Sequence, residues 1–549
     1  DTIQEAILAR INRLPEPARH LLQTASVLGR QVSLRLLKAI WGHPEGPEPD
    51  LRDLERLEFL YQHSGGEDPT YLFKHALVQE VAYESLLPAR RQALHAAAGR
   101  ALEAAYSDRL EEIYGALAYH YSKTEEALKA VEFLERFARK AALGHSHVEA
   151  VAALEDALAH AERLPPNQRD RRIVDLVLRL AYSLYSLGRF HQSVERLLGQ
   201  RNRVEQLQDP WITGRYYFRL GLTYSLMGNQ KEATENVQRA LKQATRCGDK
   251  ATMGRAHYEL ARESFWSGRP LQGLEHGRSA VALLEQTEER RWLGMAHWVV
   301  GANSAVRGEF EAALEALSQA RAIGETIGDA QIESMAGWTI GGVSATLGDW
   351  EAGLRACQQA LDRSPDPLSR AQAIGWLGYA HLEKEEPGPA VTLLEQAVQQ
   401  LTRFRFRQLQ GWFTAWLSQA YLLDGQIEKA RELASQALEL TRGVQDWYGA
   451  GVAQRVLGRS LEATGDLPGA EARLKEALET FASADARFEA GRTHLELASL
   501  ALHQGNRDAL PTHLGESYRI FRALQVAKYI GRCEQTARTS GVSLPGYQP

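Results

Sequence analysis

Cysteine is scarce in this sequence: only Cys247, Cys357 and Cys533 occur in 549 residues, and no two of them form a CxxC pair. Cysteines so few and so far apart are typical of a reducing compartment and exclude a small secreted domain held by disulfides. We find no secretory signal peptide. The closest approach to a membrane span, 176–187, is short and is interrupted by Arg179. The sequence therefore predicts a cytoplasmic protein without membrane contact.

An excess of charge of one sign is also absent. Lys and Arg total 64, Asp and Glu total 69, and the formal net charge is −5, which gives no overall attraction to nucleic acid. The sequence also lacks a GxxxxGK[ST] phosphate loop, an HExxH helix, a GxSxG elbow and any cluster of Cys and His. We therefore expect no catalytic residue, no metal site and no cofactor in this chain, which by itself would not be an enzyme.

Glycine, in contrast, recurs at a fixed spacing of 40 residues. Glu385 takes the same position between two sets of glycines, which are Gly188, Gly228, Gly268, Gly308 and Gly348, then Gly425, Gly465 and Gly505. A fixed period of this length indicates a repeat array, and a glycine at each turn favours the positive φ that ends a helix. The sequence therefore predicts an array of helix pairs, each with its turn at one of these positions.

The residues around Gly228 show what each repeat contains. A large residue, Leu, Gly and Tyr precede the turn and spaced alanines follow it, as Tyr217, Leu220, Gly221, Tyr224, Ala233 and Ala240. This pattern resembles the tetratricopeptide repeat, whose usual period is about 34 residues. We predict an all-α, right-handed superhelical solenoid with a concave face over 169–525, followed by a capping helix and tail over 526–549.

The first 106 residues do not share the repeat. We predict helices over 2–11, from about 18, over 34–40, 51–60 and 77–87, and from Pro88 to about 106, with one short strand at 71–73. Short helices followed by a small β-wing indicate a winged-helix module, preceded by a helical arm. Residues 107–168 are predicted to form a helical linker with the first repeats.

Three segments of this region carry a resemblance to a known family: Arg13–Pro15, Ala25–Gly29 and Phe73–Leu87. The sequence resembles bacterial STAND proteins, signal-transduction ATPases in which an AAA-type nucleotide-binding domain precedes a winged helix and a tetratricopeptide-like sensor. The resemblance implies that the chain is a fragment without the ATPase core. ADP or ATP would belong to a parent NTPase, of a class often attached to an adenylate cyclase or a kinase.

The resemblance implies a function for the repeat array. As a sensor, it would bind a protein segment or a small-molecule inducer on its concave face, and the winged helix would relay this to the nucleotide-binding domain of the same parent chain. Two alternatives remain open. One is a scaffold that docks protein segments without a nucleotide role, and the other is a transcription regulator whose winged helix reads DNA, against which the acidic balance argues.

One histidine carries the nucleotide prediction. In STAND proteins a winged-helix histidine contacts the β-phosphate of bound ADP, and His75 matches that position, after the predicted strand and at the start of a helix. The family usually has Asp after this histidine, whereas this chain has Ala76. An imidazole here could donate to a phosphate oxygen. The alternative is that His75 caps the helix that begins at Leu77.

A second candidate site follows the repeat. The residues ten before successive turn glycines form a ladder: Leu178, Phe218, Tyr258, Trp298 and Trp338. One helical turn further come Tyr182, Leu222, Arg262, Ala302 and Gly342, and Arg215 and Arg255 add positive charge. We predict a ligand-binding concave face made by Phe218, Tyr258, Arg262, Trp298, Trp338, Arg215, Arg255 and Tyr182. The alternative is that the aromatic residues pack between consecutive first helices.

The segment 403–407 alternates basic and aromatic residues at an expected turn between helix pairs. Such alternation can bind single-stranded nucleic acid, but a short basic run is more commonly a solvated rim.

Overall fold

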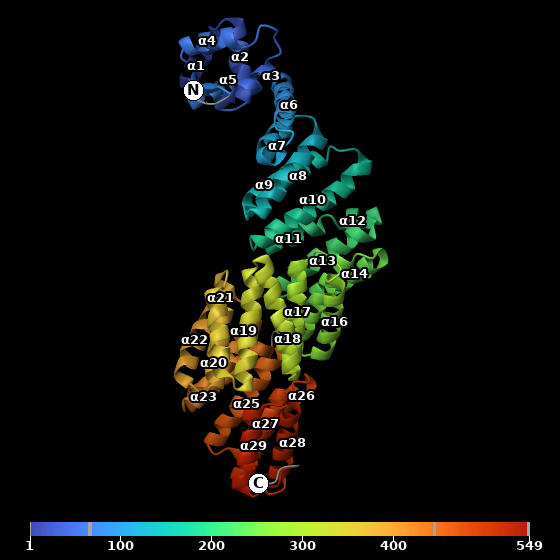
Figure 1. Cartoon of the computed structure of the whole chain (residues 1–549), viewed down its shortest axis with the longest axis vertical. Helices are drawn as coiled ribbons and strands as arrows, with labels where there is room; N and C mark the ends of the chain where they lie inside the picture. Colours follow the sequence, from blue (N-terminus) through green and yellow to red (C-terminus); the bar gives the residue numbers. More distant parts are fainter. Residues whose placement is uncertain (1, 64–67, 443–445, 546–549) are drawn as a thin grey trace. The chain divides into compact units, whose positions relative to one another are not determined.

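The computed structural model describes residues 2–63, 68–442 and 446–545, which fall into two compact units, 1–228 (unit 1) and 229–549 (unit 2). The predicted all-α class is confirmed, since the described residues form helices α1 to α29 and a single small sheet (Figure 1). The units are described in turn. The domain limits at 106, 168 and 525 stay predictions.

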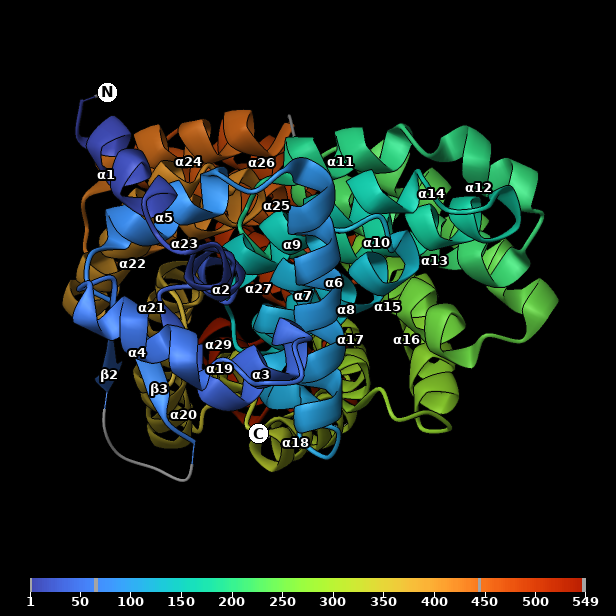
Figure 2. The ribbon, with the colours of Figure 1, turned by 90° about the horizontal axis from the view of Figure 1, so that it is seen from above.

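Unit 1 begins with helices around a three-stranded antiparallel sheet of order β1-β3-β2, in which Gln31 pairs with Leu72 and Leu60 with Phe73. Strands β2 and β3 lie beside α4 (Figure 2). The elements are α1 Thr2–Asn12, α2 Glu16–Val27, β1 Gln31–Ser33, α3 Leu34–Trp41, α4 Glu48–Arg56, β2 Leu60–His63, β3 Thr70–Phe73, α5 Ala76–Glu84 and α6 Pro88–Ala105.

The strand predicted at 71–73 is confirmed as part of β3, whereas the helix predicted over 51–60 is wrong at its C-terminal end. Helix α4 ends at Arg56, Glu58 has a φ of 60°, and Leu60 begins β2. A left-handed residue cannot continue the helix, and Leu60 is buried where it pairs with β3. Strands β1 and β2 were not predicted. Each is too short to show a clear alternation of apolar and polar residues, and each is a strand because it pairs with β3.

The rest of unit 1 is helical. Its elements are η1 Leu110–Ile113, α7 Tyr114–Ser122, α8 Ala127–Leu143, α9 His147–Ala161, α10 Pro166–Ser186, α11 Phe190–Leu198, α12 Arg201–Leu207 and α13 Pro210–Leu226. Unit 2 is an array of helix pairs: α14 Gln230–Cys247, α15 Lys250–Trp266, α16 Pro270–Leu284, α17 Arg290–Arg307, α18 Phe310–Ile327, α19 Ala330–Leu347, α20 Trp350–Asp362, α21 Pro367–Glu383, α22 Pro387–Phe404, α23 Arg407–Leu423, α24 Ile427–Arg442, α25 Trp447–Ala463, α26 Leu467–Ser483, α27 Arg487–His503, α28 Ala509–Leu524 and α29 Ala527–Ser540.

The turn positions predicted from the 40-residue period are confirmed. All eight turn glycines have positive φ, and Glu385 shares this conformation with a φ of 65°. Glycine adopts this conformation without the steric cost that a Cβ brings, which explains its recurrence. Two helix N-caps are also present: Asp249 accepts a hydrogen bond from the Thr252 amide, and Asp329 accepts one from the Gln331 amide.

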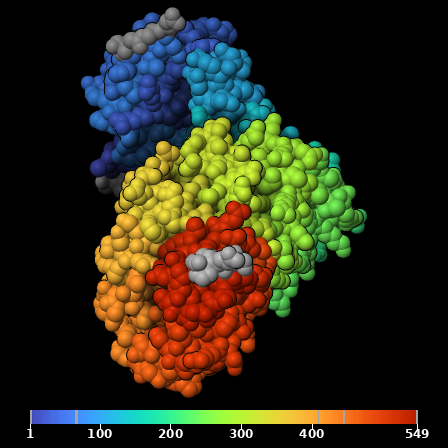
Figure 3. Space-filling view, turned by 60° about the horizontal axis from the view of Figure 1, so that its bottom comes forward, coloured from blue at the N-terminus to red at the C-terminus, as the bar shows by residue number. Residues whose placement is uncertain are grey.

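Unit 2 folds back on itself, so that residues 178 to 182 positions apart in sequence are in contact. The Trp447 indole Nε1 donates to the Phe265 carbonyl at 3.2 Å, and Arg307 forms an ion pair with Asp485. The C-terminal helices, red in Figure 3, lie against earlier segments of the unit; Leu524, for example, approaches Gly308. The core of unit 2 therefore includes contacts across the array as well as between neighbouring pairs.

Candidate ligand-binding site

The structure divides the predicted concave-face residues between the units. Tyr182, Arg215 and Phe218 belong to unit 1, and Arg255, Tyr258, Arg262, Trp298 and Trp338 to unit 2. The ladder aromatics Phe218, Tyr258 and Trp338 are buried, with exposed fractions of 3%, 2% and 3%. Trp298 is half-buried, and its indole Nε1 donates to Thr339 Oγ1 at 3.2 Å. This burial favours packing for the three buried rings, whose contact with a ligand stays a prediction.

The small residue beside Trp338 does not leave open space. A Cβ placed on Gly342 would lie 2.4 Å from the ring of Trp376, which comes from α21. The glycine is therefore needed to admit the indole of the following repeat. Ala302, beside Trp298, is also buried, at 4% exposed.

The predicted arginines all have partners. Arg255 forms an ion pair with Glu289, and Arg262 donates to the buried carboxylate of Glu259 at 2.7 Å. In unit 1, Arg215 lies over the Trp211 ring at 4.2 Å from its centroid. Tyr182 is exposed, with the Arg219 guanidinium 5.1 Å from its ring centroid. A ligand at these arginines would have to share them with their present partners.

His75 lies between β3 and α5, as expected, and its side chain is exposed. It is the N-cap residue of α5, but its imidazole makes no capping hydrogen bond. The capping interpretation of this side chain is therefore not supported, while contact with a nucleotide phosphate stays a prediction.

A cluster of aromatic residues that the sequence did not reveal fills the centre of unit 2. We define this inner aromatic cluster as Trp376, Tyr379, Trp412, Trp416 and Tyr448, from α21, α23 and α25. The rings of Tyr379 and Trp416 stack with centroids 4.3 Å apart, and those of Trp412 and Tyr448 are 4.4 Å apart. The Trp412 indole Nε1 is buried and has no hydrogen-bond partner among the residues that the structure describes.

A series of charged side chains runs next to this cluster, exposed at one end and buried at the other. We define the ionic chain, in order of contact, as Arg532, Glu385, Lys528, Glu383, Arg492, Glu489 and Arg455. Tyr448 of the aromatic cluster donates to Glu489 at 3.1 Å. Sequence reasoning located Glu385 only as a turn and missed the other residues. Arg455 nevertheless carried a signal, since it lies ten residues before Gly465, in the register of the ladder.

The members of the ionic chain stabilise one another as ions. Burial by itself raises the pKa of Glu489, but Arg455 and Arg492 outweigh it and hold that pKa below its usual value. Burial likewise opposes the charge of Arg492, yet Glu383 and Glu489 hold its pKa well above the usual value. The interior of unit 2 thus contains fixed charges beside aromatic faces, a combination that can recognise a charged ligand.

Three pairs of histidines lie across helix hairpins. The Nδ1 atoms are 3.0 Å apart in His95–His120, 2.9 Å in His257–His276 and 3.0 Å in His494–His513. The second and third pairs occupy the same repeat positions, eleven residues before and eight after Gly268 and Gly505. At such a distance one ring must donate and the other accept, so the two rings of a pair cannot both be protonated.

We expect the free energy of unfolding to fall as pH is lowered from about 6.5 to 4. Burial and the neighbouring His513 lower the pKa of His494 to about 4, and burial lowers that of His513. Both pKa values lie below that of the unfolded chain, so this stability is present above about pH 6.5 and is lost as pH falls, by up to about 1.4 kcal/mol per pH unit for each proton bound.

Urea unfolding of the parent and of a His494→Gln/His513→Gln variant, from pH 7 to 4.5, measures this effect. Four charged groups also face the pair, Glu516 and Arg519 beside His494, and Lys475 and Glu471 beside His513. Asp446 titrates in the opposite sense, because burial raises its pKa to about 7, and comparison with the parent cancels its effect. Parallel pH profiles for the two proteins would contradict the prediction.

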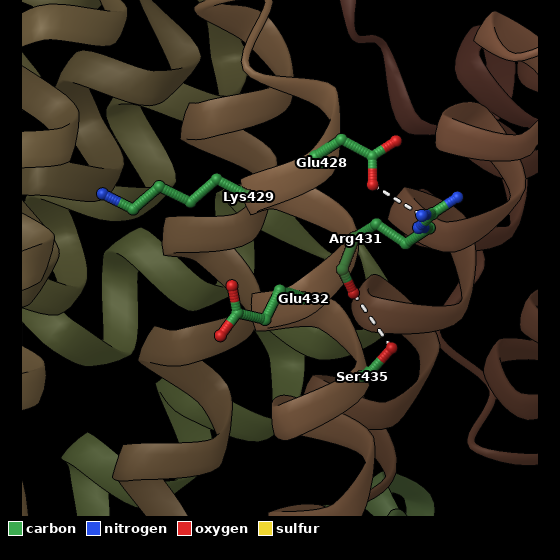
Figure 4. Close-up of a pocket in the computed structure, with 5 residues that line it drawn as sticks. All are labelled: Glu428, Lys429, Arg431, Glu432 and Ser435. Atoms are coloured by element: carbon green, nitrogen blue, oxygen red, sulfur yellow. Dashed lines mark hydrogen bonds and ion pairs between the residues drawn. The ribbon is translucent and has the colours of Figure 1, made fainter.

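The depression drawn in Figure 4 lies on α24, and its lining is charged and polar: Glu428, Lys429, Arg431, Glu432 and Ser435. Arg431 pairs with Glu428 at 2.5 Å, and Ser435 Oγ donates to the Arg431 carbonyl at 2.9 Å. Lys429 pairs with Glu395 at 3.5 Å, and Glu432 accepts a hydrogen bond from Gln436 at 3.1 Å. Each of these groups thus has a partner, as on an ordinary solvated surface.

The basic run 403–407 lies at the predicted turn, with α22 ending at Phe404, Arg405 at a φ of 56° and α23 beginning at Arg407.

Among the described residues, no group of three or more His, Cys, Asp or Glu could hold a metal ion. No helix in the part of the chain that the structure describes is long and apolar enough to cross a membrane.

Comparisons with known proteins agree with the repeat prediction. Models of the tetratricopeptide repeat match residues 214–245 and 413–483. These models describe a structural repeat and no catalytic domain. A comparison with curated protein sequences gave no significant match.

Among solved structures, a Rap protein complexed with Competence and Sporulation Factor is similar with a TM-score of 0.52 and 14% identity, over 66% of this chain and 99% of that one. At this identity the similarity shows the fold alone, a tetratricopeptide-like solenoid. A STAND protein with a tetratricopeptide repeat sensor, from Pyrococcus horikoshii, matches over 96% of this chain and 66% of that one, with a TM-score of 0.35 and 15% identity. A Rap conjugation gene regulator in complex with the Phr* peptide has a TM-score of 0.44 and 14% identity, over 68% and 98%. These last two scores carry no further argument.

Proposed function

We propose that this chain is the sensor region of a STAND-type signal-transduction ATPase, and that its repeat array binds a protein segment or a small-molecule inducer. The N-terminal elements would act as a winged helix that relays binding to the nucleotide-binding domain of the parent. The order of β1, α3, α4, β2 and β3, with two strands forming a hairpin, supports the winged-helix part of the proposal.

The nucleotide-linked part of this proposal rests on the position of His75. The segment that resembles STAND proteins, Phe73–Leu87, runs from the end of β3 through α5, and it presents an exposed imidazole at the junction. A ring in this place can donate to the phosphate of a nucleotide held by a neighbouring domain. The charged and aromatic interior of unit 2 supports the sensor part.

In the parent ATPase that this proposal requires, His75→Ala is expected to speed ADP release. A hydrogen bond to a charged group is worth about 1.5–3 kcal/mol, so the dissociation rate should rise by about 10- to 150-fold. Stopped-flow release of a fluorescent ADP measures it. The control is His63→Ala, which removes another exposed histidine, at the end of β2.

An ADP release rate in His75→Ala equal to that of the parent and of His63→Ala would refute the nucleotide role. The scaffold alternative, a solenoid that docks protein segments without a nucleotide, would then be favoured.

The chain by itself should neither bind nor hydrolyse ATP, since it has no phosphate loop.

A further inference from the structure

The ionic chain alternates in sign along its length. Lys528 Nζ lies 3.9 Å from Glu385 and 3.6 Å from Glu383. Arg492 Nη1 lies 2.8 Å from Glu383 and 3.6 Å from Glu489. Arg455 Nη1 ends the chain, 2.6 Å from the other oxygen of Glu489. Each acid thus lies between two basic groups.

The same chain runs from the surface of unit 2 into its interior. The exposed fraction of the basic side chains falls from 41% at Arg532 to 13% at Lys528, 11% at Arg492 and 5% at Arg455. The first of these residues belong to α29 and the last to α25. The buried end is therefore linked to solvent by an unbroken series of ion pairs.

The ionic chain ends, on its buried side, in a basic residue without a further acidic partner. Arg455 Nη2 is buried and has no hydrogen-bond partner in the described ranges. The ionic chain has four positive and three negative members and therefore a net charge of +1. A buried guanidinium nitrogen without an acceptor is costly, and such a group calls for a specific explanation.

The surroundings of Arg455 suit an organic ligand. The Phe481 ring centroid lies 5.5 Å from its guanidinium carbon, and Tyr448 shares Glu489 with it. Trp412, whose ring centroid lies 4.4 Å from that of Tyr448, has another buried donor without a partner among the described residues. Aromatic faces beside donors fit an apolar or peptidic group that ends in an acceptor.

We propose that Arg455 anchors a carboxylate-binding subsite in the interior of unit 2, at which Nη2 donates to a carboxylate oxygen of the ligand. This deepens the proposed sensor function, on which it rests, by naming the chemical class of the ligand. One negative charge balances the net +1, whereas a phosphate would add a second charge close to Glu489. The carboxylate belongs either to a free organic acid or to a peptide segment.

The test uses the complete chain and its thermal unfolding. The probes are propionate, acetate, and N-acetyl-trialanine with a free carboxylate or with an amide at its C-terminus, at constant ionic strength. A ligand that binds only the folded state raises Tm in a concentration-dependent, predictable way. We expect the carboxylate probes to raise Tm and the amidated peptide to leave it unchanged.

Two variants make the result specific to Arg455. Arg455→Met should abolish the shift, whereas Arg459→Met should keep it. Arg459 lies one helical turn further along α25, and its partners are Glu462 and Glu496. In Glu489→Gln the Arg455 guanidinium loses its charged partner, so acetate should bind about tenfold more tightly or better. This second variant keeps the test decisive if Arg455→Met fails to fold.

The inference is overturned if carboxylates shift the parent and Arg455→Met equally, or if they shift neither the parent nor Glu489→Gln. A tripeptide that acts at concentrations well below acetate identifies a peptide as the source, and equal potency identifies an organic acid. Both results support the subsite. Failure here leaves the ADP-release test of His75→Ala unaffected, so the two proposals are tested separately.

Discussion

Replacing Trp338 by alanine is expected to lower the free energy of unfolding by about 3–5 kcal/mol, the usual cost of removing a buried tryptophan. Trp338 is 3% exposed and belongs to the same core cluster as Phe265 and Ala302. Because protein interiors are close-packed, the neighbouring repeats can close over the space that the substitution creates only in part. Urea unfolding followed by circular dichroism measures the loss.

Trp298→Ala is the matched control, because it removes the same side chain at the equivalent position of the preceding repeat. Trp298 is only half-buried, so its loss should cost less, mainly the apolar contact and the hydrogen bond to Thr339. If Trp338→Ala were as stable as the parent, the indole would not be a packing element, and the predicted ligand-binding role would regain weight.

Glu383→Ala is the second change for which we expect a large effect, a loss of about 3–5 kcal/mol in the free energy of unfolding. Glu383 is 2% exposed, and its carboxylate accepts from Arg492 at 2.8 Å. Without it, the remaining acidic partner of the Arg492 guanidinium among the described residues is Glu489, at the longer distance of 3.6 Å. An uncompensated buried charge is more costly than the pair itself is stabilising.

Glu385→Ala is the control, because Glu385 belongs to the same ionic chain but is 51% exposed at its side chain. Its loss should change stability by about 1 kcal/mol or less. The double variant Glu383→Ala/Arg492→Met should be less destabilised than the sum of the single variants, since it removes both charges. Strict additivity would show that the two residues do not interact in solution.

The turns of the array could be predicted because they depend on local backbone chemistry. The positive φ that recurs every 40 residues selects glycine, and the same register located Glu385 without any knowledge of its neighbours. Helix α1, Thr2–Asn12, agrees with the predicted range 2–11, because its apolar periodicity is contained within one segment. Leu60 shows the opposite case, since only its pairing with Phe73 makes it part of a strand.

The candidate site could be predicted only in part, for the same reason. The ladder register correctly identified positions on successive first helices, but not that Trp376 would fill the space beside Gly342. The ionic chain includes ion pairs between residues 109 to 147 positions apart, such as Arg492–Glu383 and Arg532–Glu385, and no spacing in the sequence relates these partners. Of its members, Arg455 alone shares the register of the ladder.

The return contacts of unit 2 change how its stability is distributed. In an open solenoid each repeat touches only its neighbours, so the ends can fray while the middle stays folded. Here Trp447 is bonded to the Phe265 carbonyl, and Leu524 lies against Gly308, so late helices share contacts with early ones. The C-terminal pairs cannot open without breaking contacts in the first pairs. Unit 2 should therefore unfold as one cooperative block, and its high contact order should make its folding slow for a helical protein.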